Sequence, residues 1–360
     1  MDRRDFLALT GAGTALFAGC LGGTSGGTPT ATATDTATDT PTATDSDLPD
    51  GIYVQPFREG MAMQGTATTG DLSVAFMYSS PHRFWNVNGE SLSETPRSGN
   101  IHAMATVWDS ETGRVVPETG LSLEIQRDGE LVSQEVIYPM LSQRMGYHYG
   151  GNFGLDGDGE YTARISIGAV PDAIELTGDY AGRFREPASA EIGFAFNEEQ
   201  RDRVRAEELD AYGEPGAVRP MNMEMVPQAT APPREELPGE TFGAPNSDDA
   251  ILATGVVSRD EAPRFDADSY LYVSARTRYN GLVLPAMALE ATVTRDGSEQ
   301  FAGPLARTFD PGMGYHYGAD VGSLESGDEV TLSVTVPPQT ARHEGYERAF
   351  LEMQDVTVTV

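Results

Sequence analysis

The chain has 360 residues and a formal net charge of −31, and its 24 basic residues are all arginine. This length suits two folded domains with accessory segments. Nucleic acid is excluded as a partner, because phosphate binding needs a basic face. The acidic residues are spread along the whole chain, which is typical of proteins from halophilic archaea. At molar salt the Debye length is only about 3 Å, so any metal specificity must come from direct ligands.

Residues 1–20, MDRRDFLALTGAGTALFAGC, have the pattern of an export signal. Arg3 and Arg4 precede an apolar run that is shorter than the roughly 20 residues of a membrane span, and small residues lead to Cys20. This predicts a twin-arginine signal joined to a lipobox, with a lipid on Cys20 anchoring the protein to the outer face of the cell membrane. An uncleaved anchor helix is the alternative. Cys20 is the only cysteine, so the chain forms no internal disulfide.

Residues 21–49 are rich in Thr, Ala and Asp. Residues 24–47 contain no large apolar side chain, and such a segment cannot bury a core. We expect a disordered, O-glycosylated stalk that holds the folded part away from the membrane.

From about Gly51 the chain changes to short runs in which apolar and polar residues alternate, separated by Gly and Pro. Examples are LSVAFMY, IHAMATVW, YTARISIG and VTLSVTV. This period-two pattern predicts an all-β fold of antiparallel β-sandwiches. We expect a first β-sandwich domain at 50–200, a connector at 201–245 and a second β-sandwich domain at 246–360. The connector begins within the helix-like stretch NEEQRDRVRAEELDAYG and continues as a Pro-rich segment.

The two expected domains share a fixed register. Met313 lies 168 residues after Met145, and Arg295 lies 168 residues after Arg127. The same offset separates Pro117 from Pro285 and Gly113 from Gly281. Landmarks that keep one spacing without a gap predict an internal duplication of one β-domain.

The most specific shared element is MGYHYG, at 145–150 and again at 313–318. On a strand, Tyr147 and Tyr149 point to one face and His148 to the other, between two glycines. The imidazole would then be open to other groups. In the alternative interpretation the tyrosines anchor the core and the histidine is an inherited structural residue.

At the same offset the neighbours of the two histidines differ. His102 corresponds to Tyr270, and Met140 corresponds to Thr308. A metal site would therefore differ between the copies or be complete in only one of them.

Several short motifs resemble the small periplasmic metal-binding proteins that accompany ferrous-iron permeases. The first copy carries IYVQPF, NIHAMA, YPM and HYGGNFGL, and the second carries MGYHYGADV and VPPQTARHEGYERAF. The resemblance implies an immunoglobulin-like fold that binds copper or iron, with a metal permease or another membrane transporter as its partner. Members of that family often form homodimers, and the internal duplication could take the place of such a dimer.

The family's metal site contains a methionine, two histidines and a glutamate. By this resemblance Met140 matches the methionine and His148 the first histidine, whereas His343 lies where the second would fall, only in the second copy. The glutamate maps near Ser98 and is missing. Thioether and imidazole together suit copper better than a hard cation. The candidate ligands are Met140, His148 and His102 in the first copy, with His316 and His343 as a second pair.

Methionines recur outside these motifs. Met221, Met223 and Met225 alternate in MNMEMVPQ, so an extended segment would place their thioethers on one side as an auxiliary Cu(I) chelator. Alternatively they fill an apolar groove between the domains. We expect Met61 and Met63 to belong to the core, and His82 to be a loop residue beside Phe84 and Trp85.

The sequence contains none of the common catalytic motifs: no His-Glu-x-x-His, Gly-x-Ser-x-Gly, phosphate loop or cysteine nucleophile. We therefore expect no enzyme. The prediction is a lipid-anchored, extracytoplasmic protein that binds copper or iron in support of metal transport. The alternative is a non-catalytic surface interaction module that kept the fold without the metal. A small-molecule receptor would need a large cleft between the domains.

Overall fold

The computed structural model describes residues 49–360. The predicted export signal at 1–20 and nearly all of the predicted stalk at 21–49 lie outside the described residues. The described residues all fall within one unit, Asp47–Val360. None of the helices in this part of the chain has the length and apolar character needed to cross a membrane.

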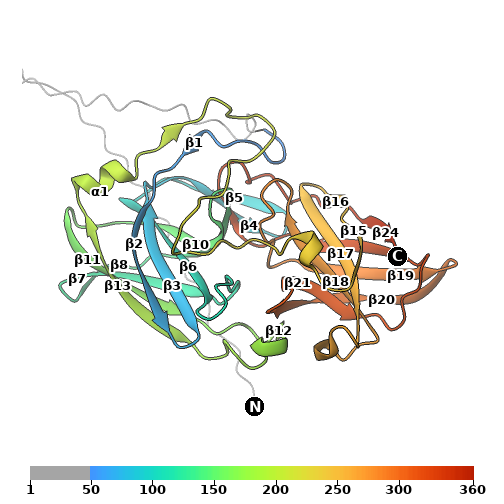
Figure 1. Cartoon of the computed structure of the whole chain (residues 1–360). Helices are drawn as coiled ribbons and strands as arrows, with labels where there is room; N and C mark the ends of the chain where they lie inside the picture. Colours follow the sequence, from blue (N-terminus) through green and yellow to red (C-terminus); the bar gives the residue numbers. More distant parts are fainter. Residues whose placement is uncertain (1–48) are drawn as a thin grey trace, which may run out of the picture. The chain divides into compact units, whose positions relative to one another are not determined.

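The described chain consists mostly of β-strands (Figure 1), which confirms the all-β prediction. In chain order the strands are β1 (Phe57–Arg58), β2 (Ala62–Thr69), β3 (Leu72–Ser79), β4 (Phe84–Asn88), β5 (Ser91–Thr95), β6 (Ile101–Asp109), β7 (Leu121–Arg127), β8 (Glu130–Ser133), β9 (Tyr138–Ser142), β10 (Gly146–Phe153), β11 (Gly159–Ile167), β12 (Ile174–Leu176), β13 (Ala188–Phe196), β14 (Glu207–Glu208), β15 (Glu240–Gly243), β16 (Asn246–Ser247), β17 (Ala250–Ser258), β18 (Ser269–Thr277), β19 (Ala288–Arg295), β20 (Ser298–Asp310), β21 (Gly314–Asp320), β22 (Glu329–Val336), β23 (Ala341–Arg342) and β24 (Val356–Thr359). Strands such as β11, β13 and β22 alternate between more and less buried residues, as the period-two pattern predicted, whereas β3, β6, β10 and β18 are buried along nearly their whole length.

Helical segments are few and short. They are η2 (Gly178–Tyr180), α1 (Glu198–Arg203), η3 (Arg234–Glu236) and η4 (Pro263–Phe265). The expected connector helix is limited to α1, whose first turn is capped by the Asn197 side chain accepting from the backbone N–H of Gln200. Beyond α1 the connector packs on the folded part: β14 pairs with β1, and Ala229 and Ala231 are buried in the hydrophobic core.

The sheets exchange short strands between the two ends of the chain. The first half contains an eight-stranded sheet in the order β2-β3-β6-β10-β9-β23-β4-β5 and a four-stranded sheet, β13-β11-β7-β8. The second half is a ten-stranded sheet that includes β17, β18, β20 and β21. Strand β23, from near the C-terminus, is parallel to β9 of the first half. Conversely, β12 of the first half is parallel to β20 of the second. Each half therefore completes a sheet of the other.

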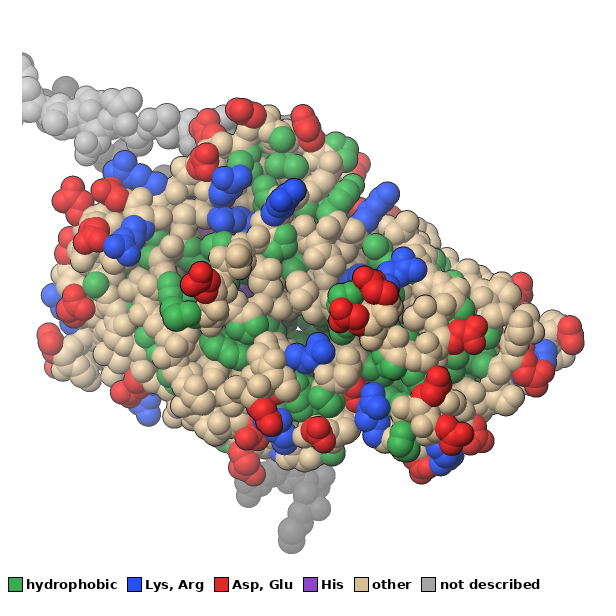
Figure 2. All heavy atoms as spheres, viewed as in Figure 1, with side chains coloured by type: hydrophobic (Ala, Val, Ile, Leu, Met, Phe, Trp, Pro, Cys, Tyr) green, Lys and Arg blue, Asp and Glu red, His purple; other side chains and the backbone are tan. Residues whose placement is uncertain are grey.

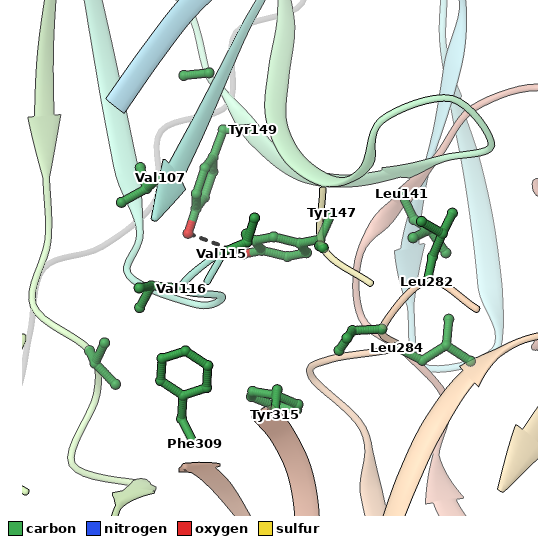
Figure 3. Close-up of a cluster of buried hydrophobic side chains, with 14 of the residues drawn as sticks. Val107, Val115, Val116, Leu141, Tyr147, Tyr149, Leu282, Leu284, Phe309 and Tyr315 are labelled. Atoms are coloured by element: carbon green, nitrogen blue, oxygen red, sulfur yellow. Dashed lines mark hydrogen bonds between the residues drawn. The ribbon is translucent and has the colours of Figure 1, made fainter. Parts of the chain in front are cut away.

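The tyrosines of the two MGYHYG frames lie in one continuous hydrophobic core. Figure 3 shows Tyr147 and Tyr149 pointing into it, with their hydroxyl oxygens 3.1 Å apart. Phe309 of β20 and Tyr315 of β21 belong to the same core. These tyrosines take the inward positions that the frame predicted, so the histidine between each pair lies on the opposite face of its strand.

Acidic and arginine side chains are mixed over the face shown in Figure 2, and histidine is almost absent from that face. Some carboxylates are buried and paired. Asp109 contacts Arg183 at 2.7 Å, and Asp328 contacts Arg295 at 2.7 Å. The high negative charge is therefore a property of the surface, whereas the histidines belong to the interior.

Candidate metal centre

One face of the eight-stranded sheet carries three of the predicted ligands. In the register of β9 and β10, His148 lies directly opposite Met140. On the other side of β10, Asn152 lies opposite His102 of β6. Residues two or four apart on a strand share a face, so Met140, His148 and His102 all project from the face away from Tyr147 and Tyr149.

Strand β23 brings His343 onto this face from near the C-terminus. The backbone N–H of His343 donates to the carbonyl oxygen of Leu141 in β9, at 3.2 Å. Its side chain then places Nε2 at 3.2 Å from Sδ of Met140. The ring centroids of His343 and His148 are 5.2 Å apart. Residues 203 positions apart in sequence thus meet in one cluster.

His82, in the loop between β3 and β4, is the fourth imidazole of the cluster. Its ring packs against that of His102 with centroids 4.0 Å apart. Its Nε2 lies 3.1 Å from Nδ1 of His343. One ring nitrogen from each of His82, His102 and His343 lies within 4.8 Å of the others. We call His82, His102, His148, His343 and Met140 the histidine cluster.

Hydrogen bonds fix the tautomers of three of these imidazoles. Nδ1 of His148 lies 3.0 Å from the carbonyl oxygen of Gly146, and Nδ1 of His82 lies 3.0 Å from that of Ser80. A carbonyl oxygen only accepts, so both Nδ1 atoms carry the proton. Each Nε2 then presents a lone pair.

His102 is fixed in the same way by Asn152. Its Nδ1 lies 2.9 Å from Oδ1 of Asn152. The amide cannot be reversed without loss, because its Nδ2 donates to the carbonyl oxygen of His82 at 2.9 Å. Nδ1 of His102 therefore donates, and its Nε2 is also a lone pair.

The last imidazole follows by elimination. Since Nε2 of His82 is an acceptor, Nδ1 of His343 donates to it, and Nε2 of His343 faces the Met140 sulfur without a proton. Nε2 of His102 and Nε2 of His148 are buried and have no hydrogen-bond partner. Three nitrogen lone pairs and one thioether thus share a site with no proton assigned to them. Buried acceptors without donors are costly, and a bound cation would relieve this cost.

Burial keeps the imidazoles of His102, His148 and His343 neutral. Desolvation lowers the pKa of His148 to about 4. It lowers the pKa of His102 and of His343 well below the ordinary value, with the neighbouring imidazoles acting in the same direction. Metal binding requires neutral imidazole, so these side chains are ready to bind at neutral pH without losing a proton.

Gly150 provides the room beside these atoms. A Cβ at this position would lie 2.7 Å from Sδ of Met140 and 2.8 Å from Nε2 of His102. Both distances are too short for real contacts. Position 150 must therefore be a glycine if Sδ of Met140 and Nε2 of His102 are to approach the β10 backbone this closely.

The second frame holds its histidine differently. Nδ1 of His316 again lies 3.0 Å from a carbonyl oxygen, that of Gly314. Its Nε2, however, lies 3.1 Å from the hydroxyl of Tyr270, which therefore donates to it. The ring of Tyr270 stacks on Phe265 with centroids 3.8 Å apart. Thr308 lies opposite His316, as Met140 lies opposite His148. Protein groups satisfy His316 completely.

The expected pairing of His316 with His343 is therefore corrected. Both ring nitrogens of His343 face members of the histidine cluster, one toward His82 and the other toward Met140. The reason is the exchange of strands, because β23 adds to the sheet of the first half. Met140, His148, His102 and His343 come together, and His316 does not join them.

His82 was missed as a site residue. Its motif, SSPHRFW, contains no ligand spacing, and only the fold of the β3–β4 loop brings it to the cluster. Among the described residues, two carboxylates lie near the cluster, and both are paired with other groups. Glu59 lines a small pocket with His82 and His343, but its Oε2 accepts from Nε2 of Gln55 at 2.9 Å. Glu344 follows His343 in sequence, but it pairs with Arg83 at 2.7 Å.

The three connector methionines do not share one side. Met221 lines a small pocket together with His343, and Met223 packs against a group of buried methionines. Met225 is 64% exposed, because the chain turns at 224–225. Met61 and Met63 pack against the same buried methionines, in agreement with a packing role.

A cavity of about 530 Å³ also lies where residues of both halves meet. Its lining includes Arg114, Tyr147, Gln228, Phe309 and Tyr315. Within the described part of the chain no carboxylate or histidine lines it. It therefore lacks the converging imidazole nitrogens that distinguish the histidine cluster.

Comparisons with known proteins agree with the resemblance that the motifs predicted. Among solved structures, the chain is similar to a copper-bound variant of FetP from Escherichia coli, with 19% identity and a TM-score of 0.32 over 38% of this chain and 97% of that one. It is also similar to a copper-bound variant of P19 from Campylobacter jejuni, with 17% identity and a TM-score of 0.30 over 38% of this chain and 98% of that one. These matches are the likeness that the short motifs predicted, and they assign no function to this chain.

Residues 235–359 match a family model described as a domain of unknown function, DUF7350. This match covers the second half of the described chain, which contributes His343. No curated protein is similar enough to count as a match.

Proposed function

We propose that this protein binds a single copper ion in the histidine cluster, outside the cytoplasm, and supplies it to or collects it for a membrane transporter. The observation that carries the proposal is the set of unprotonated acceptors: Nε2 of His102, His148 and His343 beside Sδ of Met140. Nothing in the described chain donates to them. A cation is the ligand that such a set would bind.

The donor atoms favour copper over harder ions. Imidazole nitrogen and thioether sulfur are borderline to soft ligands, whereas Mg²⁺ and Ca²⁺ prefer oxygen. The neighbouring carboxylate of Glu344 is held by Arg83, and that of Glu59 accepts from Gln55, so both nearby hard oxygen donors are already engaged. FetP and P19 are described as copper-bound, but the choice of copper for this chain depends on its own donor atoms. Iron is the second candidate ion.

We propose that a twin-arginine export signal and a lipid on Cys20 direct this function to the outer face of the membrane. Arg3 and Arg4 support twin-arginine export, in which the protein folds before it leaves the cytoplasm. A tethered carrier of this kind needs no catalytic residues, and we propose a non-catalytic role. A metal permease is the partner that such a carrier would serve.

We also propose that the two halves are copies of one immunoglobulin-like domain that pair around an internal two-fold axis. In support, a Cβ at Gly146 would lie 3.0 Å from Leu282, and a Cβ at Gly314 would lie 3.5 Å from Arg114. The two contacts are reciprocal, because Gly314 lies 168 residues after Gly146 and Leu282 lies 168 residues after Arg114. Such reciprocity is typical of an isologous interface. One chain would then do what a homodimer does, with the second copy supplying His343 to the site of the first.

Titration of the purified protein with Cu(II), Cu(I) and Fe(II) in molar KCl tests this function. We expect one tightly bound copper per chain, lost in His148→Ala and kept in His316→Ala. The two substitutions are matched, because both histidines are buried and donate through Nδ1 to a glycine carbonyl. Binding no tighter than millimolar, unchanged by His148→Ala, would contradict the proposal and favour a surface interaction module.

A further inference from the structure

A second group of soft side chains lies directly beside the histidine cluster. Seven of the 13 methionines of the chain gather there. Met77, Met104 and Met145 are buried, and the others lie around them. The seven are Met61, Met63, Met77, Met104, Met145, Met221 and Met223.

Strand register places three of these methionines on the face of the sheet that carries the histidine cluster. Met63 of β2 lies opposite Met77 of β3, and Met77 lies opposite Met104 of β6. Met104 in turn lies opposite Gly150 of β10, the residue that borders Sδ of Met140 and Nε2 of His102. Direct cross-strand partners share a face. A row of three methionines therefore runs across the sheet and ends at the histidine cluster.

A small pocket of about 30 Å³ connects the two groups. Met61, Met104, Met145 and Met221 line it, and His82 and His343 line it as well. The rest of the lining is polar or glycine, and its carboxylate, Glu59, accepts a hydrogen bond from Nε2 of Gln55 at 2.9 Å. The other polar residues are Ser79, Ser142 and Arg144. Met61 and Met221 are partly exposed, whereas Met104 and Met145 are buried. This volume suits an ion or one or two water molecules and is too small for an organic ligand. We call this the methionine pocket.

We propose that the methionine pocket is a binding site for Cu(I) through which the ion enters the histidine cluster. Neutral thioethers bind soft monovalent ions and discriminate against Fe(II) and Cu(II). Met61 and Met221 receive the ion at the surface, and Met104 and Met145 hold it beside His82 and His343. Transfer to the cluster exchanges thioether ligands for imidazole, and the copper keeps its oxidation state.

The pocket would also allow the protein to capture an ion at high salt concentration. In molar salt the surface charge attracts no ion beyond about 3 Å, so capture depends on direct ligands at the entrance. Met221 comes from the connector and Met61 from just before β2, so two separate segments meet at that entrance. The destination of the ion rests on the proposed function, whereas the thioether site can be tested without it.

The first test follows the methionine methyl resonances by NMR as Ag(I), a redox-inert soft ion, is added to the protein with ¹³C-methyl methionine. We expect the resonances of Met61, Met104, Met145 and Met221 to shift, while those of the remote Met287 and Met353 do not. Fe(II) should leave the four unchanged. Shifts confined to Met140, or spread evenly over all methionines, would overturn the inference.

The second test uses Met61→Leu with Met221→Leu, which conserves volume and so preserves packing. The matched control is Met287→Leu with Met353→Leu. We expect Cu(I) loading to slow at least about tenfold in the pocket variant only, while the equilibrium affinity for Cu(II) stays at the wild-type value. Loading as fast as in the control would mean that the methionines serve packing alone, and the inference would fail.

A third variant, His343→Ala, separates the two proposals. If Ag(I) still shifts the four methyl resonances in His343→Ala while copper no longer binds tightly, both proposals are supported. If the shifts occur but wild-type and His343→Ala bind copper equally weakly, the proposed function fails and the thioether site remains. If copper binds tightly and the shifts are absent, only the inference fails.

Discussion

The two MGYHYG frames have the same sequence and the same local geometry, but they end in opposite chemical states. In both, the histidine is buried and donates through Nδ1 to a glycine carbonyl at 3.0 Å. His148 then presents Nε2 to a site without a donor, whereas Nε2 of His316 receives a hydrogen bond from Tyr270. In the first frame Nε2 is free to accept a cation, whereas in the second it is already hydrogen-bonded to a hydroxyl.

The difference comes from two facing positions. Opposite the first histidine lies Met140, and opposite the second lies Thr308. Beside Gly150 lies the imidazole of His102, and beside Gly318 lies the hydroxyl of Tyr270. The comparison teaches that a histidine becomes a candidate ligand through the acceptors around it, because its own position and tautomer are identical in both halves.

The largest expected effect comes from substituting Gly150, the last glycine of the first frame, and Gly318 is its counterpart in the second frame. Gly150→Ala would place a Cβ 2.7 Å from Sδ of Met140 and 2.8 Å from Nε2 of His102. Because two ligand atoms must then move, we expect copper affinity to fall by at least about 100-fold, measured by competition titration. Gly318→Ala, which meets only Tyr270, should lower stability and leave copper binding unchanged. Equal copper affinity in the two variants would break the comparison.

Acid should destabilise both halves of the metal-free protein. The pKa of His148 and that of His316 are each lowered by burial to about 4, from 6.5. Between these values the unfolded chain binds the extra protons, so this stability is full above about pH 6.5 and is lost as the pH falls toward 4. Each histidine accounts for about 3 kcal/mol of the free energy of unfolding. We expect His316→Gln to reduce this pH dependence by about one proton in urea unfolding.

Copper should distinguish the contribution of His148 from that of His316 in the same urea-unfolding experiment. A bound ion keeps His148 deprotonated and leaves His316 untouched. Copper should therefore shift the acid transition of the wild type and of His316→Gln, and it should have no effect on Gly150→Ala. A copper-dependent shift in Gly150→Ala would contradict the assignment of the first frame.

A smaller loss of stability is expected from Tyr270→Phe. Within the described part of the chain it removes the one donor to Nε2 of His316 and leaves a buried acceptor unpaired, at a cost of about 1 to 3 kcal/mol. The melting temperature should fall, and copper binding at the first frame should not change. A variant as stable as the wild type would show that the Tyr270 hydroxyl does not stabilise the buried Nε2 of His316.

The smallest effect should be a gain. Tyr270→His with Thr308→Met gives the second frame the facing residues of the first. We expect a second, weaker copper-binding event in titration, because no counterpart of His343 is present: β12 lies beside β20 and carries Glu175 opposite Thr308. A second site as tight as the first would show that His343 is dispensable and would weaken the proposed ligand set.

Most residues of the candidate site, but not all of them, could be predicted from the sequence. The frame, the alternation around His148 and the resemblance pointed to Met140, His102 and His343, which the structure brings together. His82 was missed and His316 was included, because a motif carries no information about which loop or strand will face it. The connector was expected to be a helical spacer, but it packs on the sheet and provides Met221 to the methionine pocket.

By itself the sequence determined the all-β class, the burial of the tyrosines and the side of the strand on which each histidine lies. These follow from period-two alternation, which is a local property of the chain. Only the tertiary structure decided which histidine is a candidate ligand. That outcome depends on β23 pairing with β9 and on Tyr270 reaching His316. Such contacts join residues far apart in sequence, and no local pattern specifies them.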